Sequence, residues 1–234
     1  MSFQQQAKTF DSAEKMAAAY LVQYFGSKRI EYPINPFQML KDEGILFSFM
    51  KSRSLEGVYI PASDENDIPM VGINADRPIT RQRFTAAHEL CHHFRDADKE
   101  ISCPIFGTKN DMERFAEGFA AALLMPLQEL RAQVNKRKNI RGEVTFDDVL
   151  EISVYFGVSF EACLRRIAYQ IHAISGNVEN DELKKRMRKY APDNVRKKKH
   201  ISYADLYAGI IDCCQEQFTF SPTDQARFIY QLPV

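Results

Sequence analysis

The sequence predicts an α+β fold in which a small, mainly antiparallel sheet is backed by helices and followed by a helical second half. Three observations predict this fold. Two helical segments come first, three short β-type runs follow between residues 44 and 74, and the strong periodic segments after residue 80 repeat at helical spacing. The 234 residues, 45% of them apolar, are enough to bury a sizeable core without disulfides.

Two helices are expected before the sheet. The first spans residues 11–26, where Asp11 or Ser12 can cap the start. Its apolar stripe is formed by Met16, Ala19, Tyr20 and Tyr24. The second and shorter helix spans residues 35–43. It carries Pro36 in its first turn, and Gly44 closes it.

Three short β-type runs follow, at residues 44–50, 57–61 and 70–74. Polar turns separate them, and the turn at residues 63–67 contains only serine, asparagine and acidic residues. Short runs joined by such turns favour antiparallel pairing of neighbouring strands. The sequence therefore predicts a small and mainly antiparallel sheet.

The second half is expected to be helical. Residues 80–95 and 111–124 form two strong helices, separated by a loop that contains Pro104 and Gly107. Residues 146–156 and 159–172 form a pair with helix-turn-helix spacing. We interpret the basic stretch 184–200 as a solvated linker before a last helix at 202–218 and a tail at 221–234. The predicted units are a core at residues 1–130, a helix-turn-helix-like subdomain at 131–180, and a basic linker with a C-terminal helical segment at 181–234.

Composition excludes some functions and leaves others open. Lys plus Arg and Asp plus Glu both total 31, so no global field attracts the chain to nucleic acid or to a membrane. The chain has five cysteines, an odd number without paired CxxC spacing, which favours reduced thiols in a cytoplasmic protein. We find neither a signal peptide nor an apolar run long enough to span a membrane. The oligomeric state does not follow from the sequence.

Residues 88–92 read His-Glu-Leu-Cys-His within the helix expected at 80–95. Because residues four apart share one helix face, the imidazoles of His88 and His92 can reach one metal ion. Glu89 then projects beside the metal, where it can take a proton from metal-bound water. Chance matches to three fixed residues are frequent, so the pentapeptide alone does not separate a zinc site from an ordinary surface helix.

The same helix predicts where a metal would lie. An apolar arc faces the core and consists of Phe84, Ala87, Cys91 and Phe94. The two histidines of the motif lie at the edge of this arc, so a metal would sit where the core meets a cleft. Cys91 is expected in the core, and His93 is turned away from the face of the two histidines.

A mononuclear peptidase zinc needs a third protein ligand and one open position. A histidine eleven residues after His88 is excluded as that ligand, because Lys99 stands there. Glu113 and Glu117 share a face of the next helix, so one can bind zinc while the other orients a zinc histidine. Alternatively, Asn110 caps this helix, Glu113 completes the capping box, and Glu117 is the ligand.

Two motifs together resemble the ImmA/IrrE metallopeptidase-like family. The first is residues 88–92, and the second is residues 113–126, Glu-Arg-Phe-Ala-Glu-Gly-Phe-Ala-Ala-Ala-Leu-Leu-Met-Pro. The Phe-Ala-Ala and Leu-Leu-Met-Pro parts are the more specific, since many unrelated enzymes share HExxH. The resemblance covers about residues 11–172. It implies a zincin-like, gluzincin-type core with the HExxH helix against a small sheet, and Zn²⁺ as the cofactor.

The resemblance also implies roles for individual residues. Glu113 matches the family's third zinc ligand, and Glu89 matches the catalytic glutamate. Glu117 stands where the family typically has asparagine, four residues after the third ligand. A carboxylate at this position can orient a zinc histidine more strongly than an amide, or compete for the metal.

The function implied by the resemblance is an intracellular zinc endopeptidase with a narrow protein substrate. That substrate is expected to be a helix-turn-helix repressor whose cleavage relieves repression, in a mobile-element or toxin–antitoxin context. An extended substrate segment is expected to add to an edge of the sheet near residues 70–74. The alternative is a non-proteolytic regulator that binds a repressor or DNA and has a structural metal. Residues 147–167 and the basic block 184–199 motivate this alternative, but DNA binding is not favoured.

Overall fold

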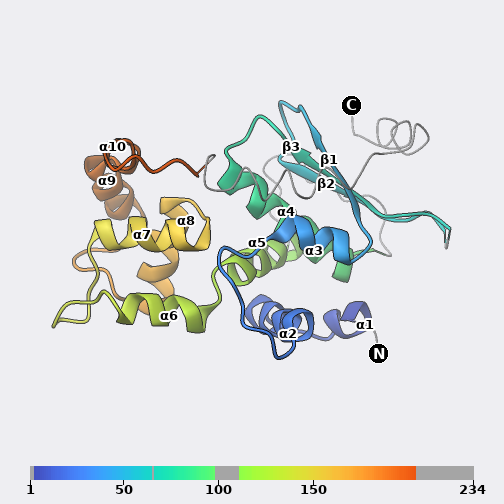
Figure 1. Cartoon of the computed structure of the whole chain (residues 1–234), viewed down its shortest axis with the longest axis horizontal. Helices are drawn as coiled ribbons and strands as arrows, with labels where there is room; N and C mark the ends of the chain where they lie inside the picture. The colour runs from blue at the N-terminus through green and yellow to red at the C-terminus, as the bar shows by residue number, and fades with distance from the viewer. Residues whose placement is uncertain (1–2, 65, 98–110, 204–234) are drawn as a thin grey trace.

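The computed structural model describes residues 3–64, 66–97 and 111–203, and places a three-stranded sheet beside two long helices (Figure 1). Several predicted features lie outside the described residues. They are the excluded ligand position Lys99, the loop with Cys103, Pro104 and Gly107, the cap Asn110, the last helix from residue 204 onward with Cys213 and Cys214, and the tail at 221–234.

Three helices precede the sheet: α1 (Phe3–Ala7), α2 (Ala13–Phe25) and α3 (Pro36–Asp42). The two predicted helices are confirmed, whereas α1 was not predicted. Helix α2 ends at Gly26, whose φ of 56° lies in the left-handed region that favours glycine. The side chain of Asn35 caps α3 by accepting hydrogen bonds from the amides of Phe37 and Gln38.

The sheet contains β1 (Leu46–Met50), β2 (Gly57–Ile60) and β3 (Met70–Asn74) in the order β1-β3-β2. Strand β2 pairs antiparallel to β3, but β1 pairs parallel to β3, so the sheet is mixed. The expectation of a mainly antiparallel sheet was therefore wrong for one of the two pairings. All five residues of β3 are buried, and burial on both sides favours the central place in the sheet.

This strand order changes where a peptide could join the sheet. Both edges of β3 are occupied by β1 and β2. The expectation that an extended substrate adds near residues 70–74 is therefore wrong, because β3 has no free edge for backbone pairing. The edge strands of the described sheet are β1 and β2.

Helix α4 (Ile79–Arg95) packs against β2 and β3 on one side and against α5 (Asp111–Leu124) on the other. Helix α2 covers α5, so the layers run from the sheet through α4 and α5 to α2 (Figure 1). Of the predicted arc on α4, Ala87, Cys91 and Phe94 are fully buried and Phe84 is partly buried. Burial of one side chain such as Phe94 contributes roughly 2–3 kcal/mol, so this arc fixes the helix to the core.

The second half is helical, as predicted: α6 (Leu127–Asn135), α7 (Phe146–Phe156), α8 (Phe160–Arg166), a π-helical turn η1 (Ile167–Ile171), α9 (Asn180–Tyr190) and α10 (Pro192–Lys198). A capping box between Thr145 and Asp148 starts α7, and Gly157 ends it with a φ of 66°. The side chain of Ser159 caps α8. Helices α7 and α8 thus form the expected helix-turn-helix-like pair.

The basic stretch is not a solvated linker, because α9 and α10 occupy most of it. Leu183, Met187 and Tyr190 recur at helical spacing on α9 and turn toward the protein. Tyr190 stacks on Phe160 of α8 with the ring centroids 5.3 Å apart. The high density of lysine and arginine concealed this short apolar stripe in the sequence.

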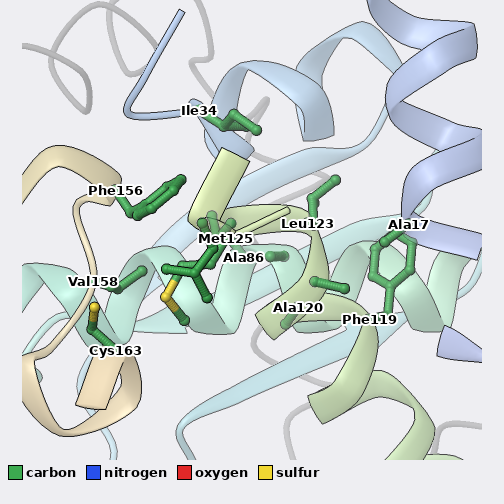
Figure 2. Close-up of a cluster of buried hydrophobic side chains, with 14 of the residues drawn as sticks. Ala17, Ile34, Ala86, Phe119, Ala120, Leu123, Met125, Phe156, Val158 and Cys163 are labelled. Atoms are coloured by element: carbon green, nitrogen blue, oxygen red, sulfur yellow. The ribbon is translucent and has the colours of Figure 1, made fainter. Parts of the chain in front are cut away.

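One hydrophobic cluster runs through both halves of the chain. Figure 2 shows Phe119, Leu123 and Met125 in one buried cluster with Phe156 and Val158 of the helix-turn-helix-like pair. The fully buried Arg83 of α4 joins the halves by donating hydrogen bonds to the carbonyl of Gly157 (3.0 Å) and to that of Ile34 (2.6 Å). The boundary at residue 130 stays a prediction, and the core is continuous across it.

Two smaller expectations concern thiols and membranes. Cys91 and Cys163 are buried and form no disulfide among the described residues. The expectation of reduced thiols for all five cysteines stays a prediction. None of the helices among the described residues combines the length and the apolar character needed to cross a membrane.

Candidate metal centre

Helix α4 brings His88 and His92 together on its α5-facing side. Their Nε2 atoms lie 3.1 Å apart, because residues four apart stand one above the other on a helix. His92 is buried, and the side chain of His88 is 14% exposed. The pair therefore lies at the boundary between the core and solvent, where a bound metal could also accept a substrate.

Helix α5 supplies a carboxylate to this pair. Glu113 places Oε2 3.1 Å from Nε2 of His88 and Oε1 3.4 Å from Nε2 of His92. Ala116 and Ala120 lie on the same face of α5 and are buried, and their small side chains let α4 and α5 approach closely. Among the described residues, one ligand atom from each of His88, His92 and Glu113 lies within 4.8 Å of the other two.

The three ligand atoms fit a tetrahedral metal ion. Zinc bonds to nitrogen and oxygen are about 2.0–2.1 Å long, so tetrahedral angles separate two ligand atoms by about 3.3 Å. The two Nε2 atoms lie 3.1 Å apart, and each lies close to one oxygen of Glu113: His88 lies 3.1 Å from Oε2 and His92 lies 3.4 Å from Oε1. These separations are close to the expected value. Three ligands also leave the fourth position open for water or substrate. The donor set of two imidazoles and one carboxylate suits zinc and related divalent ions.

A further carboxylate, which the sequence analysis missed, orients His92. Asp96 follows α4 directly, and its Oδ2 lies 2.8 Å from Nδ1 of His92. When Nδ1 carries the hydrogen and donates it to Asp96, Nε2 presents its lone pair toward the metal position. The interval of four residues between His92 and Asp96 was visible in the sequence and could have identified this contact.

Glu89 lies beside the ligands and against strand β2. Gly57 begins β2, and a Cβ atom added there would come within 2.6 Å of Oε1 of Glu89 and 2.3 Å of Cγ2 of Thr85. Only glycine therefore leaves room for the glutamate between α4 and the sheet. Periodicity could not reveal this role, because the close approach depends on how α4 packs against the sheet.

The side chains of the candidate metal centre have shifted pKa values with identifiable causes. Burial raises the pKa of Glu89, while His88 and His92 oppose this shift. Burial alone would lower the pKa of His92, but hydrogen bonds to Asp96 and Glu113 raise it to about 10. Burial alone would raise the pKa of Glu113, but hydrogen bonds to the two histidines lower it to about 2. The two shifts have one common cause, the hydrogen bond between His92 and Glu113, which favours the charged form of each partner.

Glu117, the predicted orienting residue or substitute ligand, is not one of the three converging residues. It lies one turn after Glu113 in the wall of a cavity of about 770 Å³ between α4, α5, α8 and η1. Phe84 lines the same cavity, and its ring centroid lies 6.3 Å from that of His88. The cavity thus begins next to the metal centre.

His93 is directed away from the ligand group, as expected. Its Nδ1 lies 3.1 Å from the hydroxyl of Tyr59 on β2, and burial lowers its pKa to about 4. A neutral His93 can accept the hydrogen bond of Tyr59 and so ties α4 to the edge strand β2.

A comparison with known families decides the membership of this chain. The model of peptidase family M78, described as the IrrE N-terminal-like domain, matches residues 40–168, which include both motifs. This chain belongs to that family. As a member of the IrrE N-terminal-like family it is metallopeptidase-like, and its His88, His92 and Glu113 form a candidate metal site.

The comparisons with curated proteins and with solved structures do not extend this assignment. No curated protein matches the chain significantly. A solved structure titled "Mycobacterium tuberculosis transcriptional regulator" is 17% identical, with a TM-score of 0.45 over 72% of this chain and 52% of the other. The chain therefore spans about half the length of that protein, and a likeness at this level has no bearing on function.

Proposed function

We propose that this protein is a zinc-dependent endopeptidase with a narrow protein substrate. In this proposal His88, His92 and Glu113 bind Zn²⁺, and Glu89 is the general base. The observation that carries the proposal is the convergence of the two histidines on one carboxylate. Nε2 of His88 lies 3.1 Å from Oε2 of Glu113, Nε2 of His92 lies 3.4 Å from Oε1 of the same residue, and Glu89 lies next to them. Membership of the IrrE N-terminal-like family supports it.

Each residue has a distinct part in the proposed reaction. Bound zinc supplies a water of lowered pKa and polarises the scissile carbonyl. Asp96 holds His92 in the tautomer that can bind a metal. Glu89 accepts a proton from the attacking water and delivers it to the departing amine. Burial raises the pKa of Glu89 and so makes it a stronger base than an exposed carboxylate.

In this proposal the substrate binds along the edge strand β2 and in the cavity. Gly57 of β2 lies against Glu89, so a peptide strand paired with the outer edge of β2 would run beside the general base. The cavity lined by Phe84 and Leu124 could take a side chain of the same peptide. We propose a helix-turn-helix repressor encoded beside this protein as the substrate.

Cleavage of that repressor tests the proposal. The wild-type protein, loaded with zinc, should release defined fragments, and Glu89→Gln should release none while still binding zinc. Glu113→Gln should lose zinc, whereas Glu117→Gln, the same change one turn further along α5, should keep it. Fragments formed equally by wild type and Glu89→Gln would contradict the role of Glu89. Zinc binding without cleavage would favour the non-proteolytic alternative.

A further inference from the structure

The neutral net charge of the chain conceals a strong separation of charge. Residues 184–200 contain nine lysines and arginines and one acid, Asp193, which gives a net charge of +8 with histidine neutral. Because the whole chain sums to zero, all other residues together carry −8. Helices α9 and α10, which we call the basic hairpin, hold eight of these nine cations at one end of the described molecule (Figure 1). They also contain three acids, Asp181, Glu182 and Asp193, so the net charge of the basic hairpin is +5.

Four cations of the basic hairpin are exposed and have no ion-pair partner among the described residues. No acidic group of the described residues lies within 4 Å of the charged atoms of Arg188, Lys189, Lys197 or Lys198. By contrast, the neighbouring Lys199 lies 3.7 Å from Asp147. When such cations neutralise phosphates, they release the small cations condensed on a nucleic acid, and this release favours binding.

The basic hairpin is part of the folded body. Leu183 is buried, and Met187, Tyr190 and Val195 pack against the main hydrophobic cluster. Just after α10, the hydroxyl of Tyr203 lies 2.6 Å from Oγ of Ser153 on α7. The cations therefore project from an anchored surface, so their binding to a ligand costs less conformational entropy than a flexible tail would.

The helix-turn-helix-like pair is a poorer candidate for contact with DNA. Residues 146–166 carry four acids and only two arginines. Both arginines are paired, Arg165 with Glu161 at 2.8 Å and Arg166 with Glu14 at 2.6 Å. Helix α8, which would read the major groove in such a motif, instead lines the cavity next to the metal centre.

We propose that the basic hairpin is a binding surface for nucleic acid that contacts the phosphate backbone without reading sequence. A phosphate backbone matches a surface on which four exposed cations have no ion-pair partner among the described residues and outnumber the exposed acids Asp181 and Asp193. An acidic protein fits less well, because protein interfaces require a desolvated apolar or aromatic centre. The large apolar side chains of the hairpin, Leu183, Met187, Tyr190 and Val195, face inward and leave no such centre.

The test compares two charge-matched variants of the full chain. One carries Arg188→Gln, Lys189→Gln, Lys197→Gln and Lys198→Gln. The control also removes one arginine and three lysines, all of them exposed and outside the hairpin, as Lys28→Gln, Lys51→Gln, Arg53→Gln and Lys136→Gln. Anisotropy of a fluorescent mixed-sequence duplex of about 30 base pairs, three helical turns, gives the affinity at several salt concentrations. Unfolding curves establish that both variants are folded.

The expected results are specific. Wild type and control should bind the duplex, with an affinity that falls about 100-fold between 50 and 200 mM salt if about four phosphates are neutralised. The hairpin variant should lose most of this affinity and most of the salt dependence. Absence of binding at low salt, or equal losses in both variants, would overturn the proposal. Displacement of the duplex by poly-glutamate at equal charge would point to an acidic protein instead.

This inference does not depend on the proposed peptidase activity. The basic hairpin lies away from the sheet (Figure 1), and its four cations are not part of the metal centre. Duplex binding by Glu89→Gln should equal that of wild type. Loss of DNA binding without loss of cleavage, or the reverse, would therefore identify which of the two proposals has failed.

Discussion

The carboxylate of Asp96 lies 2.8 Å from Nδ1 of His92, one helical turn after the histidine and at the end of the same helix. The backbone amide of Asp96 also donates a 2.8 Å hydrogen bond to the carbonyl of His92. The residue thus caps α4 and orients a ligand of the candidate metal centre. Both partners are buried, so solvent weakens this interaction little.

Asp96→Asn should reduce the zinc affinity about 10-fold or more, because the amide removes the negative charge that favours the correct tautomer of His92. Competition with a chromophoric chelator measures the affinity. Asp76→Asn, at an exposed aspartate just after β3, is the matched control and should leave the affinity unchanged. An unaltered affinity in Asp96→Asn would exclude the orienting role.

Gly57→Ala should abolish most proteolysis. The added Cβ would approach Oε1 of Glu89 to 2.6 Å and Cγ2 of Thr85 to 2.3 Å, so the glutamate must move. We expect a loss of about 100-fold in activity, the scale at which small displacements of catalytic groups act. In the double variant with Thr85→Ser, which lacks Cγ2, thermal stability should recover while activity stays low. Recovery of both stability and activity would mean that the contact of the new Cβ with Thr85, and not the one with Glu89, causes the loss of activity.

Arg83 and Gly157 should be energetically coupled. Gly157→Ala places a Cβ 3.0 Å from Nε of Arg83 and imposes a left-handed φ on alanine, so we expect a loss of about 2 kcal/mol. Gly142→Ala has the same type of φ but open space, and should lose only about 1 kcal/mol. Urea unfolding measures both. In a protein that also carries Arg83→Met, the losses of unfolding free energy caused by Gly157→Ala and Gly142→Ala should become more similar. If the effects of Arg83→Met and Gly157→Ala simply add, the two residues are not coupled.

His93 should make the free energy of unfolding depend on pH. Its pKa is about 4 in the folded protein because of burial, against about 6.5 in the unfolded chain. Between these values the unfolded chain binds more protons, so the stability is fully present above pH 6.5 and is lost as the pH falls toward 4. We expect a loss of about 3 kcal/mol from this residue by pH 4.

His93→Asn can still accept a hydrogen bond from Tyr59 but does not titrate, so it should flatten this pH dependence in urea unfolding between pH 4 and 7. His172→Asn, at an exposed histidine with a φ of 58°, is the control and should retain the wild-type profile. If the free energy of unfolding depends on pH equally in wild type and His93→Asn, then groups other than His93 cause the pH dependence.

The helical elements were predictable because their determinants are local. The cap at Asn35, the stripe of α2 and the stop at Gly157 each depend on residues within a few positions. The helices α9 and α10 were not predicted, because the many lysines and arginines of this stretch indicated a solvated linker. The apolar stripe of α9 consists of only three side chains, Leu183, Met187 and Tyr190. The parallel pairing of β1 with β3 was missed because pairing joins residues distant in sequence, such as Leu46 and Met70.

The sequence by itself determined that His88, Glu89 and His92 lie together, because helix geometry alone sets the relation between residues one and four apart. The same rule places Asp96, four residues after His92, on the same helix face as that histidine. Only the tertiary structure decided that Glu113 meets the two histidines and that Gly57 leaves room for Glu89, because both contacts arise where α5 and β2 pack against α4. Packing depends on the shapes of whole surfaces, and no local spacing encodes it.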